Sequence, residues 1–194
     1  METENKIVRY FIENKRKLTI RELAKNLKLD YKIVHTASLR LVKKGLLGLE
    51  KIGQSSQLSF INKFSKEVLE AELKRREEIL GNKDILIVMK SINEKIKSVN
   101  YIALLFGSYA KKNYNKKSDI DLIFIVPSED LEKKIEKIIS LMPLKIHYFV
   151  FTEEQFLKMN NSKEPNIIHE AVKNNILLYG VEQYYNLIGG MKYD

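Results

Sequence analysis

The sequence predicts an α/β (α+β) protein in two parts: N-terminal helices closed by a β-hairpin, then a mixed sheet with flanking helices. Three observations support this prediction. Helix-capping signals recur in the first sixty residues, which end in two short strand-like runs. From residue 101 onward, apolar strand-like runs alternate with helical segments. The 194 residues are 44% hydrophobic, enough for one ample core or two small ones.

Composition excludes several classes of protein. No run of about 20 apolar residues is present, so we expect no membrane span and no membrane partner. The N-terminus lacks the apolar run of a signal peptide, and cysteine is absent, which excludes disulfides and Cys-ligated zinc. These features predict a cytoplasmic protein. The net charge of +9 favours polyanions such as nucleic acid, although a lysine-rich solvated surface explains it equally well.

The first 62 residues carry the local signals of three helices and a hairpin. An amphipathic pattern covers Glu4–Asn14, and Thr19 with Glu22 three residues later forms the capping box of a second helix. Asp30 is placed to cap a third helix, which Gly45 ends. Two strand-like runs follow, Leu46–Ile52 and Gln57–Ile61, around the turn sequence Gly53-Gln54-Ser55-Ser56.

This order of elements resembles a winged helix domain over residues 1–62, with the third helix as the recognition helix. The resemblance implies DNA binding, and a homodimer that reads two half-sites. Winged helices also serve as dimerisation or protein-docking modules, which Leu39 on the outward face of the third helix favours. The expected DNA contacts on that face are Lys32, His35, Thr36 and Lys43.

Residues 63–98 are predicted to be connecting helices, because their pattern is charged and helical and is broken at Gly81-Asn82. Residues 99–194 are predicted to form the second domain. Its expected strands are Tyr101–Phe106, Asp119–Val126 and Leu144–Phe151, with helices at Ser128–Leu141, after Thr152 and around Ile167–Asn174, and an apolar run at Ile176–Tyr179.

The sequence from Leu104, LLFGSYAKKNYNKKSDIDLIFIV, carries the chemistry. Gly107 allows a sharp turn after an apolar strand, and Ser108 is expected to cap a helix whose N–H groups favour phosphate. Asp119 and Asp121 lie two residues apart at the start of the next strand, so their side chains share one face. Because two adjacent carboxylates repel each other, a divalent cation such as Mg²⁺ would stabilise them and bridge to phosphates.

Gly107-Ser108, ten residues, and Asp119-Ile120-Asp121 together resemble the G-S-x10-D-x-D signature of polymerase-β-like nucleotidyltransferases, especially their small "minimal" branch. The resemblance covers residues 100–180. It implies transfer of a nucleoside monophosphate from an NTP, with ATP favoured, to a hydroxyl acceptor. It also implies Mg²⁺ as cofactor. The implied site residues are Asp119 and Asp121 at the metal, and Gly107, Ser108, Lys111 and Ser118 at the nucleotide.

The sequence departs from this family pattern in two places. The family's third aspartate is absent from the next strand, where His147 takes the nearest equivalent position. His147 is therefore the third catalytic candidate, as base or ligand, although a hydrogen-bonded strand residue would look the same. In addition, Lys112 stands where many relatives have glycine, and Asn113 is expected to adopt the unusual backbone conformation instead.

Two functions are consistent with these patterns. The first is an active Mg²⁺-dependent nucleotidyltransferase whose acceptor is a protein hydroxyl, an RNA end or a small molecule. Several members of the minimal branch resemble antitoxins that modify a partner toxin protein, so an antitoxin is one form of this hypothesis. The second is a catalytically weak, nucleotide-sensing transcriptional regulator that binds DNA through its winged helix.

Overall fold

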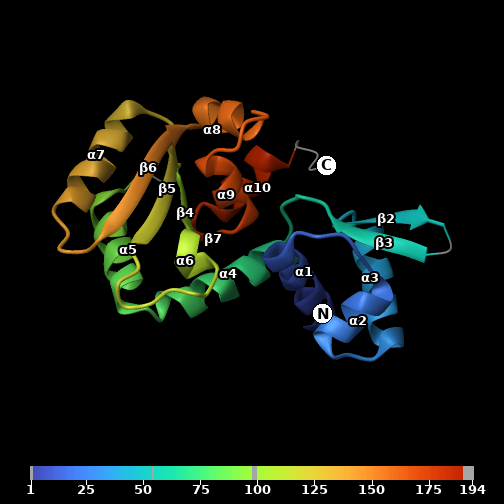
Figure 1. The fold of residues 1–194 in the computed structure, drawn as a ribbon. Helices are drawn as coiled ribbons and strands as arrows, with labels where there is room; N and C mark the ends of the chain where they lie inside the picture. The colour runs from blue at the N-terminus through green and yellow to red at the C-terminus, as the bar shows by residue number, and fades with distance from the viewer. Residues whose placement is uncertain (1, 54, 98–99, 190–194) are drawn as a thin grey trace. The chain divides into compact units, whose positions relative to one another are not determined.

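A computed structural model describes residues 2–53, 55–97 and 100–189 of the chain. The chain divides into two compact units (Figure 1). Unit 1 comprises the described residues of Met1–Leu73 and Tyr185–Asp194, and unit 2 is Lys74–Tyr184. This division differs from the one drawn from the sequence, because residues 63–98 are not a separate segment. Helix α4, Lys66–Leu80, crosses from unit 1 into unit 2, and the helix that follows it belongs to the core of unit 2.

The helices of unit 1 are α1 (Glu2–Asn14), α2 (Ile20–Leu27) and α3 (Tyr31–Lys43). The predicted capping box is confirmed. The Thr19 hydroxyl accepts the Glu22 N–H, and the Glu22 carboxylate accepts the Thr19 N–H. The predicted Asp30 cap is also confirmed, since its Oδ1 accepts hydrogen bonds from the N–H groups of Lys32 and Ile33 in the first turn of α3. Local side chains therefore define where these helices begin.

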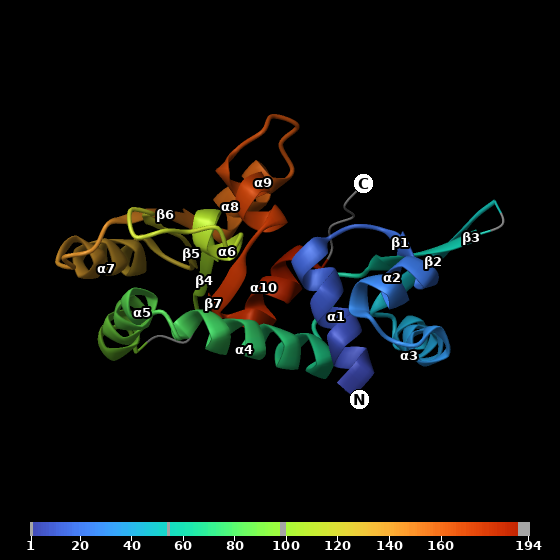
Figure 2. The same ribbon diagram turned by 60° about the horizontal axis from the view of Figure 1, so that its bottom comes forward.

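The sheet of unit 1 consists of β1 (Leu18–Thr19), β2 (Leu47–Ile52) and β3 (Ser55–Phe60), antiparallel in the order β1-β3-β2. The β2–β3 hairpin is visible in both ribbon views (Figures 1 and 2). Ser55 and Ser56 belong to β3 and not to the predicted turn, whose Gln54 lies outside the described residues. The two-residue strand β1 was not predicted, because two residues carry no alternation pattern. The elements follow the order expected of a winged helix, which itself remains a prediction.

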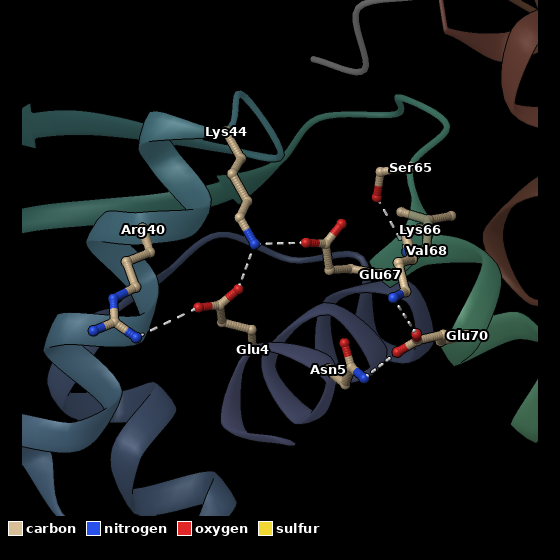
Figure 3. A network of polar contacts seen from close by, with 9 residues as sticks. All are labelled: Glu4, Asn5, Arg40, Lys44, Ser65, Lys66, Glu67, Val68 and Glu70. Atoms are coloured by element: carbon tan, nitrogen blue, oxygen red, sulfur yellow. Dashed lines mark hydrogen bonds and ion pairs between the residues drawn. The ribbon is translucent and has the colours of Figure 1, made fainter. Parts of the chain in front are cut away.

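A polar network ties three helices of unit 1 together (Figure 3). The Nζ atom of Lys44, just after α3, lies 2.6 Å from the carboxylate of Glu4 on α1 and 2.6 Å from that of Glu67 on α4. Glu4 is only 5% exposed, and Arg40 adds a longer contact of 3.8 Å to it. Burial of Glu4 is therefore compensated by cations from α3.

The sheet of unit 2 is mixed, as the sequence predicted. Its order is β6-β5-β4-β7, with β4 antiparallel to both of its neighbours and β5 parallel to β6. The central strands are buried along nearly their whole length, which explains their continuous apolar runs. The strands are β4 (Ile102–Phe106), β5 (Ile120–Val126), β6 (Ile146–Thr152) and β7 (Ile176–Tyr179).

Helices cover both faces of this sheet (Figure 1). The main core lies on the face covered by α5 (Lys83–Lys95) and α7 (Glu129–Ser140). Helices α8 (Glu153–Asn160) and α9 (Ile167–Lys173) pack on the other side, and Thr152 forms the predicted cap of α8. Helix α10, Val181–Ile188, begins in unit 2 and ends in unit 1. Among the described residues, no helix is long and apolar enough to cross a membrane.

Candidate active site

The two predicted carboxylates lie at the start of β5, one strand away from the β6 edge of the sheet. Asp119 immediately precedes β5, and Asp121 is its second residue. Their side chains are 33% and 24% exposed, so both are half-buried and still accessible. Because β5 pairs with β4 on one side and with β6 on the other, the backbone that holds the carboxylates is fixed by hydrogen bonds on both sides.

His147 lies beside both carboxylates. It is the register partner of Asp121 in the parallel β5–β6 pair, so the two side chains share a face. Its Nε2 is 3.6 Å from Oδ2 of Asp119, and its Nδ1 is 3.6 Å from Oδ1 of Asp121. These distances exceed a normal hydrogen bond and describe an electrostatic contact. The side chain is 66% exposed, which leaves the ring open to a substrate.

The site disfavours two negative charges. Burial raises the pKa of the Asp121 carboxyl, the charges of Asp119 and Glu170 raise it further, and His147 opposes the rise. Glu170 on α9 is an acidic neighbour that the sequence did not reveal. It lies 49 positions beyond Asp121 in the chain, and only the packing of α9 near β4 brings it here.

Gly107 provides the room for Asp121. Its φ of +64° is in the left-handed region, and a Cβ atom on it would overlap Oδ2 of Asp121. Helix α6, Gly107–Ala110, starts at this glycine and is a single turn. Ser108 lies within that turn, so the prediction that it caps the helix is wrong. The N-cap residue is Phe106, and no side chain caps the helix.

The segment after α6 also corrects the sequence interpretation. Lys112 itself adopts the left-handed conformation, with φ of +57°, and Asn113 does not. The Nζ of Lys111 is 2.8 Å from Oε1 of Glu170, so this candidate phosphate ligand is paired with an acid. Ser118 keeps its hydroxyl within the loop, where Oγ accepts the Asn115 N–H. The nucleotide roles of Lys111 and Ser118 remain predictions.

The residues of the site suit a magnesium ion. The two carboxylates are oxygen donors from one strand, and their charges are partly buried next to each other. In the part of the chain that the structure describes, no group of three or more acidic, His or Cys side chains is arranged to hold a metal. Asp119 and Asp121 would therefore share a bound ion with substrate phosphates and water, which is how Mg²⁺ commonly binds.

The predicted DNA contacts lie on α3 of unit 1. Lys32, Thr36 and Lys43 are exposed, whereas His35 is partly buried with its ring 5.7 Å from that of Tyr31. Leu39 is exposed in the same row. The helix thus presents both cationic and apolar side chains, and its role remains a prediction.

A comparison with protein families identifies unit 2. A family model described as polymerase beta, nucleotidyltransferase matches residues 88–184. No curated protein matches the chain. Among solved structures, a crystal structure of a toxin–antitoxin with AMP-PNP is 16% identical, with 53% of this chain and 77% of that chain covered and a TM-score of 0.32. This likeness is too weak to indicate a shared function. The family match spans half of the chain and includes every catalytic candidate. Through residues 88–184, the chain belongs to the polymerase beta nucleotidyltransferase family.

Proposed function

We propose that unit 2 transfers a nucleoside monophosphate from an NTP, with ATP favoured, to a hydroxyl acceptor. The observation that carries the proposal is the meeting of Asp119, Asp121 and His147 on one face of β5 and β6. Membership of the nucleotidyltransferase family supports it. The acceptors that the sequence leaves open are a protein hydroxyl, as in an antitoxin acting on a partner toxin, an RNA end and a small molecule.

In the proposed reaction, the acceptor oxygen attacks the α-phosphorus, a new O–P bond forms and the bond to pyrophosphate breaks. His147 takes the hydroxyl proton, because its exposed ring lies beside both carboxylates. Asp119 and Asp121 would hold Mg²⁺, which when bound neutralises phosphate charge and activates the attacking oxygen. Gly107 allows Asp121 to lie close to the turn that follows β4.

To contact the triphosphate, Lys111 would give up its ion pair with Glu170. Its side chain and that of Glu170 are 39% and 45% exposed, and ion pairs of this kind contribute only about 0.2–1 kcal/mol. A triphosphate carries far more negative charge than one carboxylate, so it competes effectively for the lysine.

Transfer of label from an α-labelled NTP to candidate acceptors tests this function. We expect labelled product with the wild type and none with Asp119→Asn. Asp130→Asn, which removes an exposed carboxylate on α7, is the matched control and should retain activity. Equal transfer by Asp119→Asn and wild type would contradict the assignment of the site.

A second candidate is DNA binding by unit 1, as a nucleotide-sensing regulator or alongside catalysis. Residues 1–62 contain 13 Lys and Arg but only six Asp and Glu, so they carry most of the net charge of +9. The exposed Lys32, Thr36 and Lys43 on α3 add side chains suited to phosphates and bases. A homodimer would present two such helices to two half-sites.

The salt dependence of DNA binding tests this second candidate. If Lys32 and Lys43 each contact a phosphate, Lys32→Ala and Lys43→Ala should each reduce the slope of log K against log salt by about 0.9. Lys6→Ala, an exposed lysine on α1 paired with Glu2, should leave the slope unchanged. If the slopes of Lys32→Ala and Lys43→Ala equal those of wild type and of Lys6→Ala, the protein-docking role of α3 is favoured instead.

A further inference from the structure

The outer strand of the unit 2 sheet, β6, has an open edge (Figure 1). Its neighbour in the sheet is β5, on one side. The strand is seven residues long, and its sequence, IHYFVFT, contains no Lys, Arg, Asp, Glu or Pro. Charged residues and proline are features that commonly prevent an edge strand from pairing with another chain. Strand β6 therefore lacks the usual protection of an edge.

The other edge strands of the two sheets are short or charged. Strand β1 has two residues and β7 has four. Strand β2 is six residues long but carries Glu50 and Lys51. In the part of the chain that the structure describes, β6 is thus the one long edge strand without a charged residue or proline.

The pairing with β5 determines which backbone groups of β6 point to the open edge. Ile120 donates its N–H to the carbonyl of Lys145, so this carbonyl points toward β5. Backbone groups of successive strand residues point to alternate sides. The residues whose N–H and C=O groups point away from β5 are therefore Ile146, Tyr148 and Val150. Among the described residues, none forms a hydrogen bond with these groups.

These three open residues are complementary to themselves. An antiparallel pair of β6 strands centred on Tyr148 places Ile146 of each copy opposite Val150 of the other. In this register every outward N–H group of the three residues faces an outward C=O group. The open stretch ends there, because the next outward N–H, that of Thr152, donates to the side chain of Gln155 in its own chain. A two-fold axis generates this arrangement, which closes after two copies.

The charges at the two ends of β6 favour a second copy of the chain over an unrelated peptide. Lys145 directly precedes the strand and Glu153 directly follows it, and both are exposed. Antiparallel pairing brings the start of one strand next to the end of the other. Lys145 of each copy is then a diagonal neighbour of Glu153 of the other, within reach of a long side chain.

The same pairing brings a residue of the second copy to the candidate active site. His147 is 66% exposed, and Phe149, on the same face of β6, is 41% exposed. In this register Phe149 of one copy lies opposite His147 of the other, with Cα atoms about 4.5 Å apart. The second copy approaches from the side away from β5, so the ring nitrogens of His147 still face Asp119 and Asp121.

We propose that two copies of the chain form a dimer by antiparallel pairing of their β6 strands, centred on Tyr148, and that Phe149 of each copy packs against His147 of the other. The two four-stranded sheets then form one continuous sheet. The contact with Phe149 restricts the exposed ring of His147 to its position beside the carboxylates. The dimer does not depend on nucleotide transfer, so either proposal can fail without the other.

Sedimentation velocity of the full chain measures the dimer and its dissociation constant. We expect a dimer for the wild type and a monomer for Phe149→Lys, which places a charge within the pairing. Leu49→Lys is the matched control, because Leu49 is 43% exposed on the edge strand β2 of unit 1, and this variant should remain a dimer. Circular dichroism would show that each variant is folded. A monomeric wild type, or a dimer that persists in Phe149→Lys, would overturn the proposal.

Charge reversal tests the pairing through exposed residues, whose substitution leaves the fold intact. Lys145→Glu and Glu153→Lys should each weaken the dimer about tenfold, because two ion pairs per dimer become repulsive. The double variant Lys145→Glu/Glu153→Lys restores opposite charges and should dimerise as the wild type does. Equal dissociation constants for the wild type and all three variants would overturn the antiparallel arrangement.

A crosslink within the interface tests the register. The chain contains no cysteine, so Tyr148→Cys supplies a single thiol. A short thiol crosslinker should join two copies of this variant, because position 148 lies opposite itself at a Cα separation of about 5.5 Å. Ile87→Cys, at a position on α5 that is 50% exposed, is the control and should not be joined. No crosslink in Tyr148→Cys, or equal crosslinking of both variants, would overturn the proposal.

Discussion

A Cβ atom on Gly107 would occupy the same space as Oδ2 of Asp121. The glycine is thus required for two independent reasons, its positive φ and the position of the carboxylate. Gly107→Ala should destabilise unit 2 through backbone strain of about 1 kcal/mol and through an overlap that costs roughly 1–3 kcal/mol more. Displacement of Asp121 should also abolish transfer. Thermal unfolding and the label-transfer assay would measure the two effects.

Gly45→Ala is the control for this prediction. Gly45 has a φ of +69°, nearly that of Gly107, but a Cβ atom there would meet nothing within 4 Å. Gly45→Ala should therefore lose only the stability that corresponds to the backbone strain, and nucleotide transfer should be unchanged. If both variants lose the same stability and keep activity, the close approach of Gly107 to Asp121 has no functional role.

Asp121→Asn should stabilise the ligand-free protein. The folded pKa of Asp121 is raised above the ordinary value of 3.8, so the folded state disfavours its charged form. Its destabilising effect therefore appears as pH rises above 3.8 and is fully present once the pH exceeds the folded pKa. Removing one of two repelling, partly exposed charges should raise Tm by about 1–3 °C at pH 7 and by nothing near pH 3.

The same substitution should remove the stabilisation by nucleotide and Mg²⁺, so that stability and function change in opposite directions. Asp130→Asn should alter neither quantity, because Asp130 is exposed on α7. A ligand-free Asp121→Asn protein that melts below the wild type at pH 7 would contradict the electrostatic reading of the site.

His147→Ala should reduce the rate of transfer by on the order of 10²-fold, since general bases contribute at least this much. Because the side chain is 66% exposed, Tm should change little, and nucleotide should still stabilise the variant. A rate within a few-fold of wild type would show that His147 is only a structural residue of β6.

Local sequence signals predicted the local structure well. The hydroxyl of Thr19 and the carboxylate of Asp30 determine where α2 and α3 begin, and both can be read from spacing alone. The same holds for Asp119 and Asp121, because residues two apart on a strand share a face. The contact of His147 with both carboxylates followed once β6 was placed next to β5.

Contacts between segments that are distant in the chain were not predicted from the sequence. Glu170 comes near Asp121 and Lys111 only because α9 packs near β4, and no short-range pattern encodes that approach. The stacking of Tyr109 on Tyr114 depends on the path of the loop after α6. The predicted positive φ at Asn113 was wrong, and Lys112 adopts it instead. Residue preference favours asparagine in this conformation, but tertiary context overrode that preference.

Lys44 should be a stability determinant of unit 1. Hydrogen bonding to Glu4 and then to Glu67 raises the pKa of Lys44, and the bond from Lys44 lowers the pKa of Glu67. Lys44→Met leaves the buried Glu4 with only the longer Arg40 contact, so it should cost about 1–2 kcal/mol at pH 7. Chemical denaturation would measure this free energy.

The pH dependence of that effect has a definite sign. A lowered acid pKa gives stability that is present above 4.5 and is lost as pH falls through the folded pKa of Glu67. A raised lysine pKa gives stability that is present below 10.5 and is lost as pH rises above it. The difference in the free energy of unfolding between wild type and Lys44→Met should therefore vanish at low pH and at high pH. Lys6→Met removes a lysine from an exposed ion pair on α1, and its free energy of unfolding should equal that of wild type at every pH.

Thermal melting with each NTP, with and without Mg²⁺, tests the central claim most directly. A ligand at about 100 times its Kd adds roughly 2.7 kcal/mol, which corresponds to a Tm increase of about 5–10 °C for a chain of this size. We predict an increase that requires both nucleotide and Mg²⁺ in the wild type and is absent from Asp119→Asn and Asp121→Asn. No increase with any NTP, or an equal increase in the variants, would contradict the assignment of Asp119 and Asp121 as a nucleotidyltransferase site.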